Sequence, residues 1–344
     1  MSPLIWSLLI SSLSTSTIIT MSSHHWLVAW LGLELNTLSI LPIIIMRHHP
    51  RAAEAATKYF LIQTMAAALI LFASTLNAWQ TGHWSIINTT LPIATTTITV
   101  AVMLKLGLAP THAWYPEVLQ GSTLTTALVL STWQKLAPLT LLFLMNNNLP
   151  NNMTLIMGAL SIIVGGWAGL NQTQTRKIMA FSSIAHMGWL SIALNTSLNV
   201  TTTTFILYTI MTTAMFMPII ILATKTLTDL GLAWSQAPGL TTMMLATLMS
   251  LGGLPPLSGF MPKWLILTSL CHTKLLVLSV IITAATLPSL LFYMRMAYLT
   301  TLTTPPNTTP TQHKWRRNIL SPQLLTPIMT TATLLLPLTP MMIT

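Results

Sequence analysis

The sequence predicts an all-α polytopic membrane protein with about eleven transmembrane helices. Of its 344 residues, 53% are hydrophobic and only 5% are charged, whereas about a quarter of the residues of a soluble domain are charged. Apolar segments of about 20 residues recur along the chain, which is the length that a helix needs to cross a bilayer. The connections between them are mostly short, so the sequence leaves no room for a separate soluble domain.

The excess of basic residues does not indicate a nucleic-acid partner. The 14 Lys and Arg residues give a net charge of +10, but they lie in apolar sequence or in short loops and form no dense basic face. The single cysteine, Cys271, excludes an intrachain disulfide, a CxxC redox site and a cysteine-held iron–sulfur cluster. No histidine spacing suggests a metal, so we expect neither a metal nor a cofactor in this chain.

The first five expected spans include one broken segment. They are residues 3–21, 25–45, 55–78, 91–119 and 123–145. The fourth is interrupted at Gly107-Leu108-Ala109-Pro110-Thr111-His112, because proline lacks the N–H that a helix interior requires. Non-helical backbone at membrane depth persists only where protein or water surrounds it. We therefore expect this break to lie inside the helix bundle.

The remaining spans repeat this order and add one helix. They are residues 153–171, 177–195, 201–223, 239–271, 275–300 and 321–343. The ninth is interrupted at Leu251-Gly252-Gly253-Leu254-Pro255-Pro256-Leu257-Ser258-Gly259. Two interrupted segments in corresponding positions of two halves are typical of inverted-repeat transporters. Because five is an odd number of spans, the second half would enter the membrane from the opposite face.

This pattern predicts four parts along the chain. They are a first five-helix repeat over 1–150, a second, inverted five-helix repeat over 151–300, a polar connecting loop over 301–320 and a C-terminal transmembrane helix over 321–344. The loop ends in the basic cluster Lys314-Trp315-Arg316-Arg317. Such a cluster fits either contact with a partner protein or contact with anionic lipid headgroups, and the sequence leaves both open.

Basic residues favour one side of the membrane. The connections on the side of the N-terminus contain Arg47, Arg51, Lys58, Arg176, Lys177, Lys225, Arg295, Lys314, Arg316 and Arg317. The other side has only Lys274. Because basic residues concentrate in loops on the inner side of a membrane, the N-terminus is expected to face the inside compartment and the C-terminus the outside.

Four charged side chains lie well inside the expected spans: Glu34, Lys105, Lys135 and Lys263. A lysine at the bilayer centre costs about 2.5–3.5 kcal/mol on insertion scales, and its ammonium reaches water only from near a helix end. A Glu–Lys pair whose separation changes can load and release a proton, so these four residues predict a proton path. Alternatively, Glu34 is a neutral core residue, and Lys105 and Lys263 donate to carbonyls freed at the breaks.

Two histidines are further candidates for the proton path. His112 lies in the first break, and His186 lies about ten residues into the seventh span. Imidazole changes charge near neutral pH and relays protons. The alternative is that each is a hydrogen-bonded core histidine.

Four stretches then carry a family resemblance. They are EAATKYFLIQ (54–63), KLGLAPTHAWYPEVLQG (105–121), RKIMAFSSIAHMGW (176–189) and LGGLPPLSGFMPKW (251–264). These stretches resemble the antiporter-like membrane subunits of respiratory complex I, of the animal mitochondrial type, and the likeness covers nearly the whole chain. The resemblance implies paired inverted repeats that move protons through buried lysines and water. It also implies that Glu34 is the carboxylate, Lys105 its partner, Lys135 the linking lysine and Lys263 the exit lysine.

The resemblance further implies the setting in which this chain works. We expect a proton-translocating subunit of an NADH:ubiquinone oxidoreductase in the mitochondrial inner membrane, with its N-terminus on the matrix side and its C-terminus on the intermembrane-space side. NADH, FMN, iron–sulfur clusters and ubiquinone would act in partner subunits, and the contacts would be lipid and other membrane-arm subunits, including further antiporter-like ones. Fuller-length members have fourteen helices, and this chain is expected to begin at their fourth with both repeats intact.

Two other functions remain compatible with the residues alone. One is a subunit of a cation/proton antiporter without redox coupling, which would use the same helices and lysines. The other is a structural membrane subunit whose buried charges bind neighbouring chains.

Overall fold

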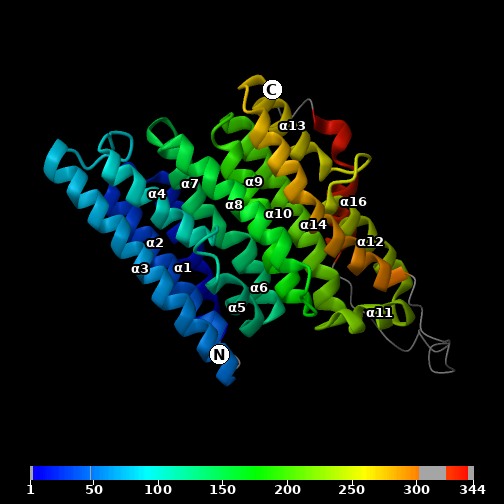
Figure 1. Ribbon diagram of the computed structural model, residues 1–344. Helices are drawn as coiled ribbons and strands as arrows, with labels where there is room; N and C mark the ends of the chain where they lie inside the picture. The colour runs from blue at the N-terminus through cyan, green and yellow to red at the C-terminus, as the bar shows by residue number, and fades with distance from the viewer. Residues whose placement is uncertain (1–2, 47, 302–322, 340–344) are drawn as a thin grey trace. The chain divides into compact units, whose positions relative to one another are not determined.

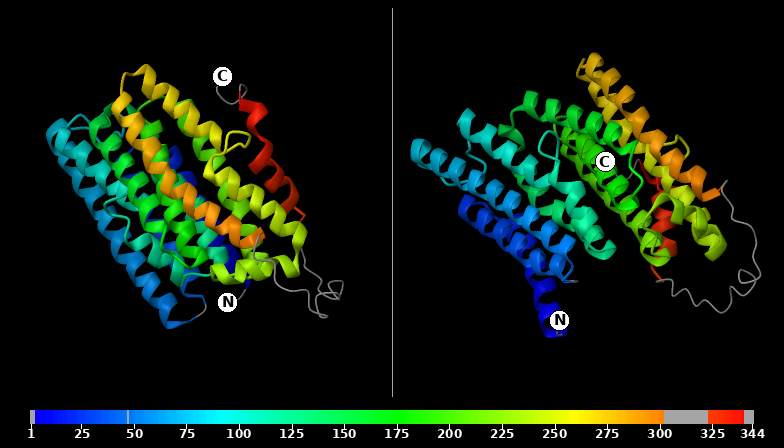
Figure 2. Two further views of the ribbon diagram at one scale, coloured as in Figure 1. Left: turned by 45° about the vertical axis from the view of Figure 1, so that its right-hand side comes forward. Right: turned by 60° about the horizontal axis from the view of Figure 1, so that its bottom comes forward.

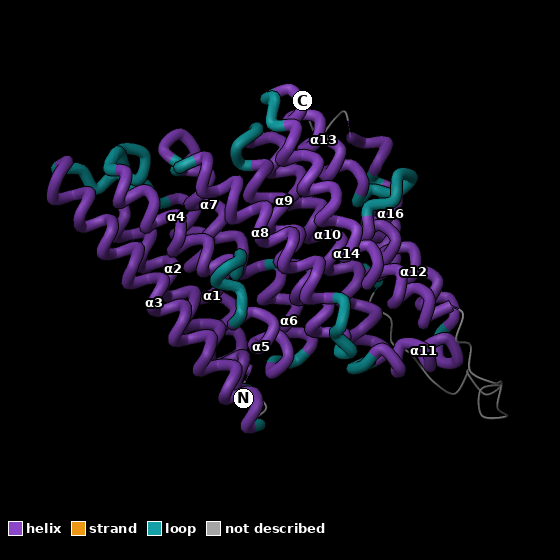
Figure 3. Tube along the Cα trace, in the orientation of Figure 1, coloured by secondary structure: helices purple, strands orange, loops and turns teal. Residues whose placement is uncertain are grey.

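The computed structural model describes residues 3–46, 48–301 and 323–339, and within these ranges every extended regular element is a helix (Figures 1 and 3). The expectation of an all-α polytopic protein is thereby confirmed. Two compact units make up the chain, Met1–Ser161 and Ile162–Thr344, and the boundary falls within helix α8 (Asn151–Gly169). Each unit is described by itself.

The first unit contains the helices before α8. They are α1 (Pro3–Ser22), α2 (Trp26–Ile45), α3 (Pro50–Thr81), α4 (Pro92–Leu106), α5 (Trp114–Gly121), α6 (Leu124–Ser131), the short 3₁₀ turn η1 (Trp133–Lys135), α7 (Leu136–Leu144) and the 3₁₀ turn η2 (Asn146–Asn148). Helix α1 packs on α2, α2 on α3, and α3 on both α4 and α5, while α7 lies against α4 (Figure 1). The two halves of the broken fourth span, α4 and α5, thus share α3 as a neighbour.

The second unit contains the helices after α8. They are α9 (Thr175–Ala193), α10 (Leu198–Leu222), α11 (Leu227–Gln236), α12 (Pro238–Gly252), α13 (Phe260–His272), α14 (Leu276–Thr301), α16 (Leu325–Leu334) and the 3₁₀ turn η4 (Leu336–Leu338). Helix α14 packs against α12 and α13 (Figure 2). Helix α11 begins with a capping box in which Asp229 accepts from the backbone N–H groups of Thr226 and Lys225. These hydrogen bonds favour the carboxylate and lower the pKa of Asp229.

Seven helical stretches in the described residues are long and apolar enough to cross a membrane. They are α1, α2, α3, Leu124–Leu144, α8, α10 and α14. The other four expected spans also contain helices, but α4/α5 and α12/α13 are interrupted, α9 is not among the seven, and α16 has only ten residues. A ten-residue helix is about 15 Å long, which is half of a hydrocarbon core of about 30 Å. The count of eleven spans therefore stays a prediction.

Both expected breaks are present, and they share one backbone geometry. Gly107 and Gly253 have positive φ angles of 76° and 81°, which glycine adopts without steric cost. At the first break, the N–H of Gly107 donates to the Leu104 carbonyl and that of Leu108 to Met103; at the second, the N–H of Gly253 donates to Ser250 and that of Leu254 to Met249. This is the Schellman pattern, which satisfies carbonyls that a helix end leaves unpaired.

A third irregularity lies within the expected span 123–145. The stretch Leu124–Leu144 has the composition of a span, but η1 (Trp133–Lys135) interrupts its α-helix. Pro138 explains this locally, because a proline cannot donate to the carbonyl four residues before it, which is that of Gln134. Lys135 is therefore located at a helix irregularity.

The C-terminal helix contacts the second break. Ser258 donates its hydroxyl to the Ala332 carbonyl at 2.5 Å and its backbone N–H to the Thr333 carbonyl at 3.2 Å. Pro337, four residues after Thr333, cannot donate to that carbonyl, so Ser258 takes the place of the missing helix bond. The expected loop over 301–320, apart from Thr301, lies outside the described residues, as do Arg47 and the cluster Lys314–Arg317. Of the expected helix 321–343, residues 323–339 are described.

Replacing Gly259 with alanine is expected to destabilise the second break. A Cβ there would lie 1.7 Å from the Ser250 carbonyl oxygen, whereas one on Gly252 would meet nothing within 4 Å. Because a backbone oxygen cannot move aside cheaply, we expect Gly259→Ala to cost roughly 3 kcal/mol or more. Thermal unfolding and the yield of assembled protein measure the effect. A Gly259→Ala protein as stable as Gly252→Ala would contradict this packing.

Candidate functional site

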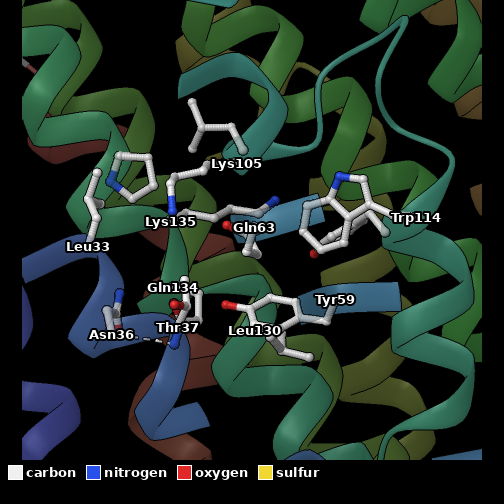
Figure 4. A pocket seen from close by; sticks show the side chains of 13 residues that line it. Leu33, Asn36, Thr37, Tyr59, Gln63, Lys105, Trp114, Leu130, Gln134 and Lys135 are labelled. Carbon is white, nitrogen blue, oxygen red and sulfur yellow. Dashed lines mark hydrogen bonds between the residues drawn. The ribbon is translucent and has the colours of Figure 1, made fainter. Parts of the chain in front are cut away.

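A small polar cavity lies in the first unit, where both halves of the broken span meet the irregular turn at Lys135. Its volume open to the centre of a water molecule is about 20 Å³, which is room for about one water. The side chains around it come from seven elements (Figure 4). Its lining is Leu33, Asn36, Thr37, Tyr59, Gln63, Lys105, Leu106, Trp114, Tyr115, Leu130, Gln134, Lys135 and Pro138.

Lys105 reaches this cavity from the last turn of α4 and is only 6% exposed. Its ammonium nitrogen is buried and has no hydrogen-bond partner among the described residues. The nearby Leu104 carbonyl accepts instead from the indole N–H of Trp114 at 3.2 Å. The alternative in which Lys105 donates to a carbonyl freed at the break is thus not observed.

Lys135 enters the same cavity from η1 and is 3% exposed. Its ammonium nitrogen lies 4.9 Å from the centroid of the Tyr115 ring, over the ring face. This geometry is a cation–π contact, which strengthens when water is excluded. The neighbouring Gln134 donates to the Asn36 side chain at 3.1 Å, drawn as the dashed line in Figure 4, so α2 is joined to the irregular turn.

Glu34 does not line the cavity, although its neighbour Leu33 does. One of its carboxylate oxygens is buried and without a hydrogen-bond partner in the described part of the chain. It is close enough to Lys105 to interact electrostatically. The only ion pairs within 4 Å among the described residues, however, are those that Lys58 makes with Glu54 and Glu117. The predicted Glu34–Lys105 pair is therefore not in direct contact.

A second cavity, also of about 20 Å³, lies in the second unit beside the other break. It is lined by His186, Trp189, Thr204, Tyr208, Met211, Gly259, Pro262 and Lys263. Lys263 donates to the Gly252 carbonyl at 2.7 Å, so this lysine does bind backbone freed at a break. The Nε2 atom of His186 lies 3.4 Å from the Tyr293 hydroxyl. The two expected site residues of this unit thus share one cavity.

The sequence did not indicate the aromatic and amide partners of these lysines. Tyr115, Tyr59 and Gln63 line the first cavity, and Tyr208 lines the second. Their contacts depend on how helices rotate against one another, which spacing along one helix does not give. Pro138, following Lys135 in the sequence KLAP, was the available signal for the irregular turn.

The remaining candidate of the first unit, His112, lies apart from the two lysines. His112 is half-buried in the first break and does not line the first cavity. No three His, Cys, Asp or Glu side chains gather within the described ranges in a way that could hold a metal ion.

The sequence matches two protein families along almost its whole length. Residues 23–288 match the family described as NADH:quinone oxidoreductase/Mrp antiporter, TM. The chain belongs to this family. Residues 290–343 match the C-terminal region of NADH dehydrogenase subunit 2. Curated relatives named NADH-ubiquinone oxidoreductase chain 2 share 50% identity in Tetraodon nigroviridis, over 100% of this chain and 99% of the relative, and 46% in Xenopus laevis, over 100% of both.

Two solved structures have a similar fold. A chain of respiratory complex I from Thermus thermophilus superposes with a TM-score of 0.83 at 25% identity, over 97% of this chain and 78% of that one. A chain of the Mrp complex from a Dietzia species superposes with a TM-score of 0.79 at 14% identity, over 87% of this chain and 61% of that one. At 14% identity, the second likeness shows the fold alone.

Replacing Trp114 with phenylalanine is expected to destabilise the first break while keeping an aromatic ring there. The Leu104 carbonyl would lose its indole donor and keep only the N–H of Gly107, and the loss of one such hydrogen bond costs about 0.5–1.5 kcal/mol. The matched control is Trp79→Phe, because Trp79 is 84% exposed. Thermal unfolding of the two variants measures the difference; equal melting temperatures would show that the indole N–H contributes nothing.

Proposed function

We propose that this chain is a proton-translocating membrane subunit of an NADH:ubiquinone oxidoreductase, respiratory complex I. The observation that supports this most is the placement of Lys105 and Lys135, both almost fully buried, around one cavity that has room for water. Buried lysines at membrane depth are expensive and mark ion or proton paths. The family of the chain contains quinone oxidoreductases and proton antiporters.

The two lysines of the first cavity act as a coupled pair in this proposal. Two ammonium groups facing one small cavity repel each other, so protonation of one favours loss of the proton from the other, and the pair titrates as a unit. A water in the cavity would carry the proton between them. Glu34 would bias the pair through its charge on Lys105. In the second unit, His186 and Lys263 would pass the proton through the cavity that both line.

The redox chemistry belongs to other subunits of the assembly. NADH, FMN, iron–sulfur clusters and ubiquinone would be handled there, and this chain would contribute charge relay and gated hydration. Curated relatives that match the chain over its full length carry the oxidoreductase name. They favour this function over an antiporter subunit without redox coupling. Other membrane-arm subunits, including antiporter-like ones, and lipid are the proposed contacts.

The proposal also includes a placement in the mitochondrial inner membrane. The relatives from animals and the apolar helices support a multi-pass protein of that membrane. The bias of basic residues toward one set of connections supports an N-terminus on the matrix side and a C-terminus on the intermembrane-space side. We further propose that 1–150 and 151–300 are inverted repeats, as the shared geometry of the two breaks suggests.

Replacing Lys135 with methionine tests the relay. The expected result is an assembled complex whose proton translocation and coupled NADH oxidation fall about tenfold or more, because a positioned proton-transfer group contributes at least that much. The matched control is Lys274→Met, which makes the same change in an exposed turn. Proteoliposomes containing the assembled complex report both quantities. An unchanged number of protons per NADH in Lys135→Met would overturn the proposed function.

A further inference from the structure

The half-helix α5 is attached to α3 by three contacts along one face. The ring of Trp114 meets that of Tyr59 edge-on, with centroids 5.8 Å apart. Three residues later, Glu117 accepts from the Lys58 ammonium at 2.6 Å. Four residues after that, a Cβ on Gly121 would lie 2.6 Å from the Ala55 side chain. Residues three and four apart share a helix face, so this face of α5 is the one that docks on α3.

The opposite face of α5 carries Tyr115. Tyr115 lies two positions before Glu117, which is about 200° around a helix of 3.6 residues per turn. Glu117 therefore points to Lys58 at the surface while Tyr115 points into the cavity, where its ring lies over Lys135. A change in the rotation of α5 about its axis would move both contacts together.

Nothing in the covalent chain fixes that rotation. The non-helical break, residues 107–113, precedes α5, and the short link Ser122–Thr123 follows it. Trp114 and Gly121 set how closely α5 approaches α3, and the indole N–H of Trp114 also ties the first residue of α5 to the Leu104 carbonyl of α4. Lys58–Glu117 is the charged, directional contact one turn further along α5. Lys58 also binds Glu54, one turn earlier on its own helix, at 2.5 Å, so the ammonium is held in place independently of α5.

We propose that Lys58 and Glu117 are positioning residues for Lys135: their ion pair sets the rotation of α5 and so holds the Tyr115 ring over the Lys135 ammonium. This inference rests on the proposed function of Lys135. An exposed ion pair contributes little to stability, so its effect is on geometry inside the cavity rather than on folding. The side chains of Lys58, Glu54 and Glu117 are 40–60% exposed. Salt therefore also screens the ion pair between Lys58 and Glu117.

The chain offers a matched pair of variants. Glu54→Gln and Glu117→Gln each remove one carboxylate from Lys58, but only the second breaks the link to α5. In the assembled complex, we expect Glu117→Gln to lower coupled turnover and proton translocation about three- to fivefold, because an exposed ion pair can bias the rotation of α5 by no more than its own interaction energy. Glu54→Gln should stay within about twofold of the parent. KM for ubiquinone should not change in either.

Two further variants separate positioning from a general loss of structure. The charge swap Lys58→Glu with Glu117→Lys restores an ion pair between α3 and α5, so it should recover most of the loss seen in Glu117→Gln. Tyr115→Leu should show the same defect as Glu117→Gln, and the double variant should be no worse than either single one, because both changes remove one contact. NADH oxidation with a water-soluble acceptor gives the amount of assembled enzyme for normalisation.

The outcomes distinguish this inference from the function on which it rests. If Lys135→Met impairs proton translocation but Glu117→Gln behaves like Glu54→Gln, or the charge swap fails to recover activity, the positioning role is wrong and the relay stands. Additive losses in the double variant would also overturn the positioning role. If Lys135→Met translocates protons normally, the proposed function itself fails.

Discussion

Holding lysine ammonium groups at membrane depth, away from bulk water, is the constraint on which the rest of this structure depends. Such a group requires polar neighbours, because an unpaired charge in a low dielectric is strongly unfavourable. In the first unit, the neighbours of Lys105 and Lys135 are side chains from α2, α3, α5 and η1, including Asn36, Gln63 and an aromatic face. Polar groups and a small cavity are thus gathered where an apolar core would otherwise form.

Interrupted helices make this gathering possible. A continuous helix satisfies its own backbone and offers only side chains, whereas a break exposes carbonyls and brings a second half-helix toward the same point. The two breaks use the same glycine-based turn but satisfy their carbonyls differently. At the first break, the Leu104 carbonyl accepts from the N–H of Gly107 and from the indole N–H of Trp114, and the Lys105 ammonium has no hydrogen-bond partner among the described residues. Lys263 itself donates to the second. The two lysines are therefore not physically equivalent, although their positions beside the breaks are alike.

Much of this arrangement could be predicted from the sequence, for reasons that are local. Apolar length located the helices, glycine and proline located the breaks, and the cost of burying charge singled out the three lysines. The details that the sequence did not predict depend on tertiary contacts between helices. The contact of the Tyr115 ring with Lys135 depends on the rotation of α5, and the 3₁₀ turn at Lys135 follows from Pro138 only once helices are known to flank it on both sides. The sequence also suggested a Glu34–Lys105 pair, but these two side chains make no direct ion pair within 4 Å.

The most direct test of the central claim is a high-resolution map of the assembled complex that resolves water inside this chain. We expect an ordered water in the first cavity, within hydrogen-bond distance of about 2.7–3.2 Å of the ammonium of Lys105 or Lys135, and a second beside Lys263 and His186. Dry packing around these side chains, or ammonium groups turned out of the cavities toward lipid headgroups, would contradict the account.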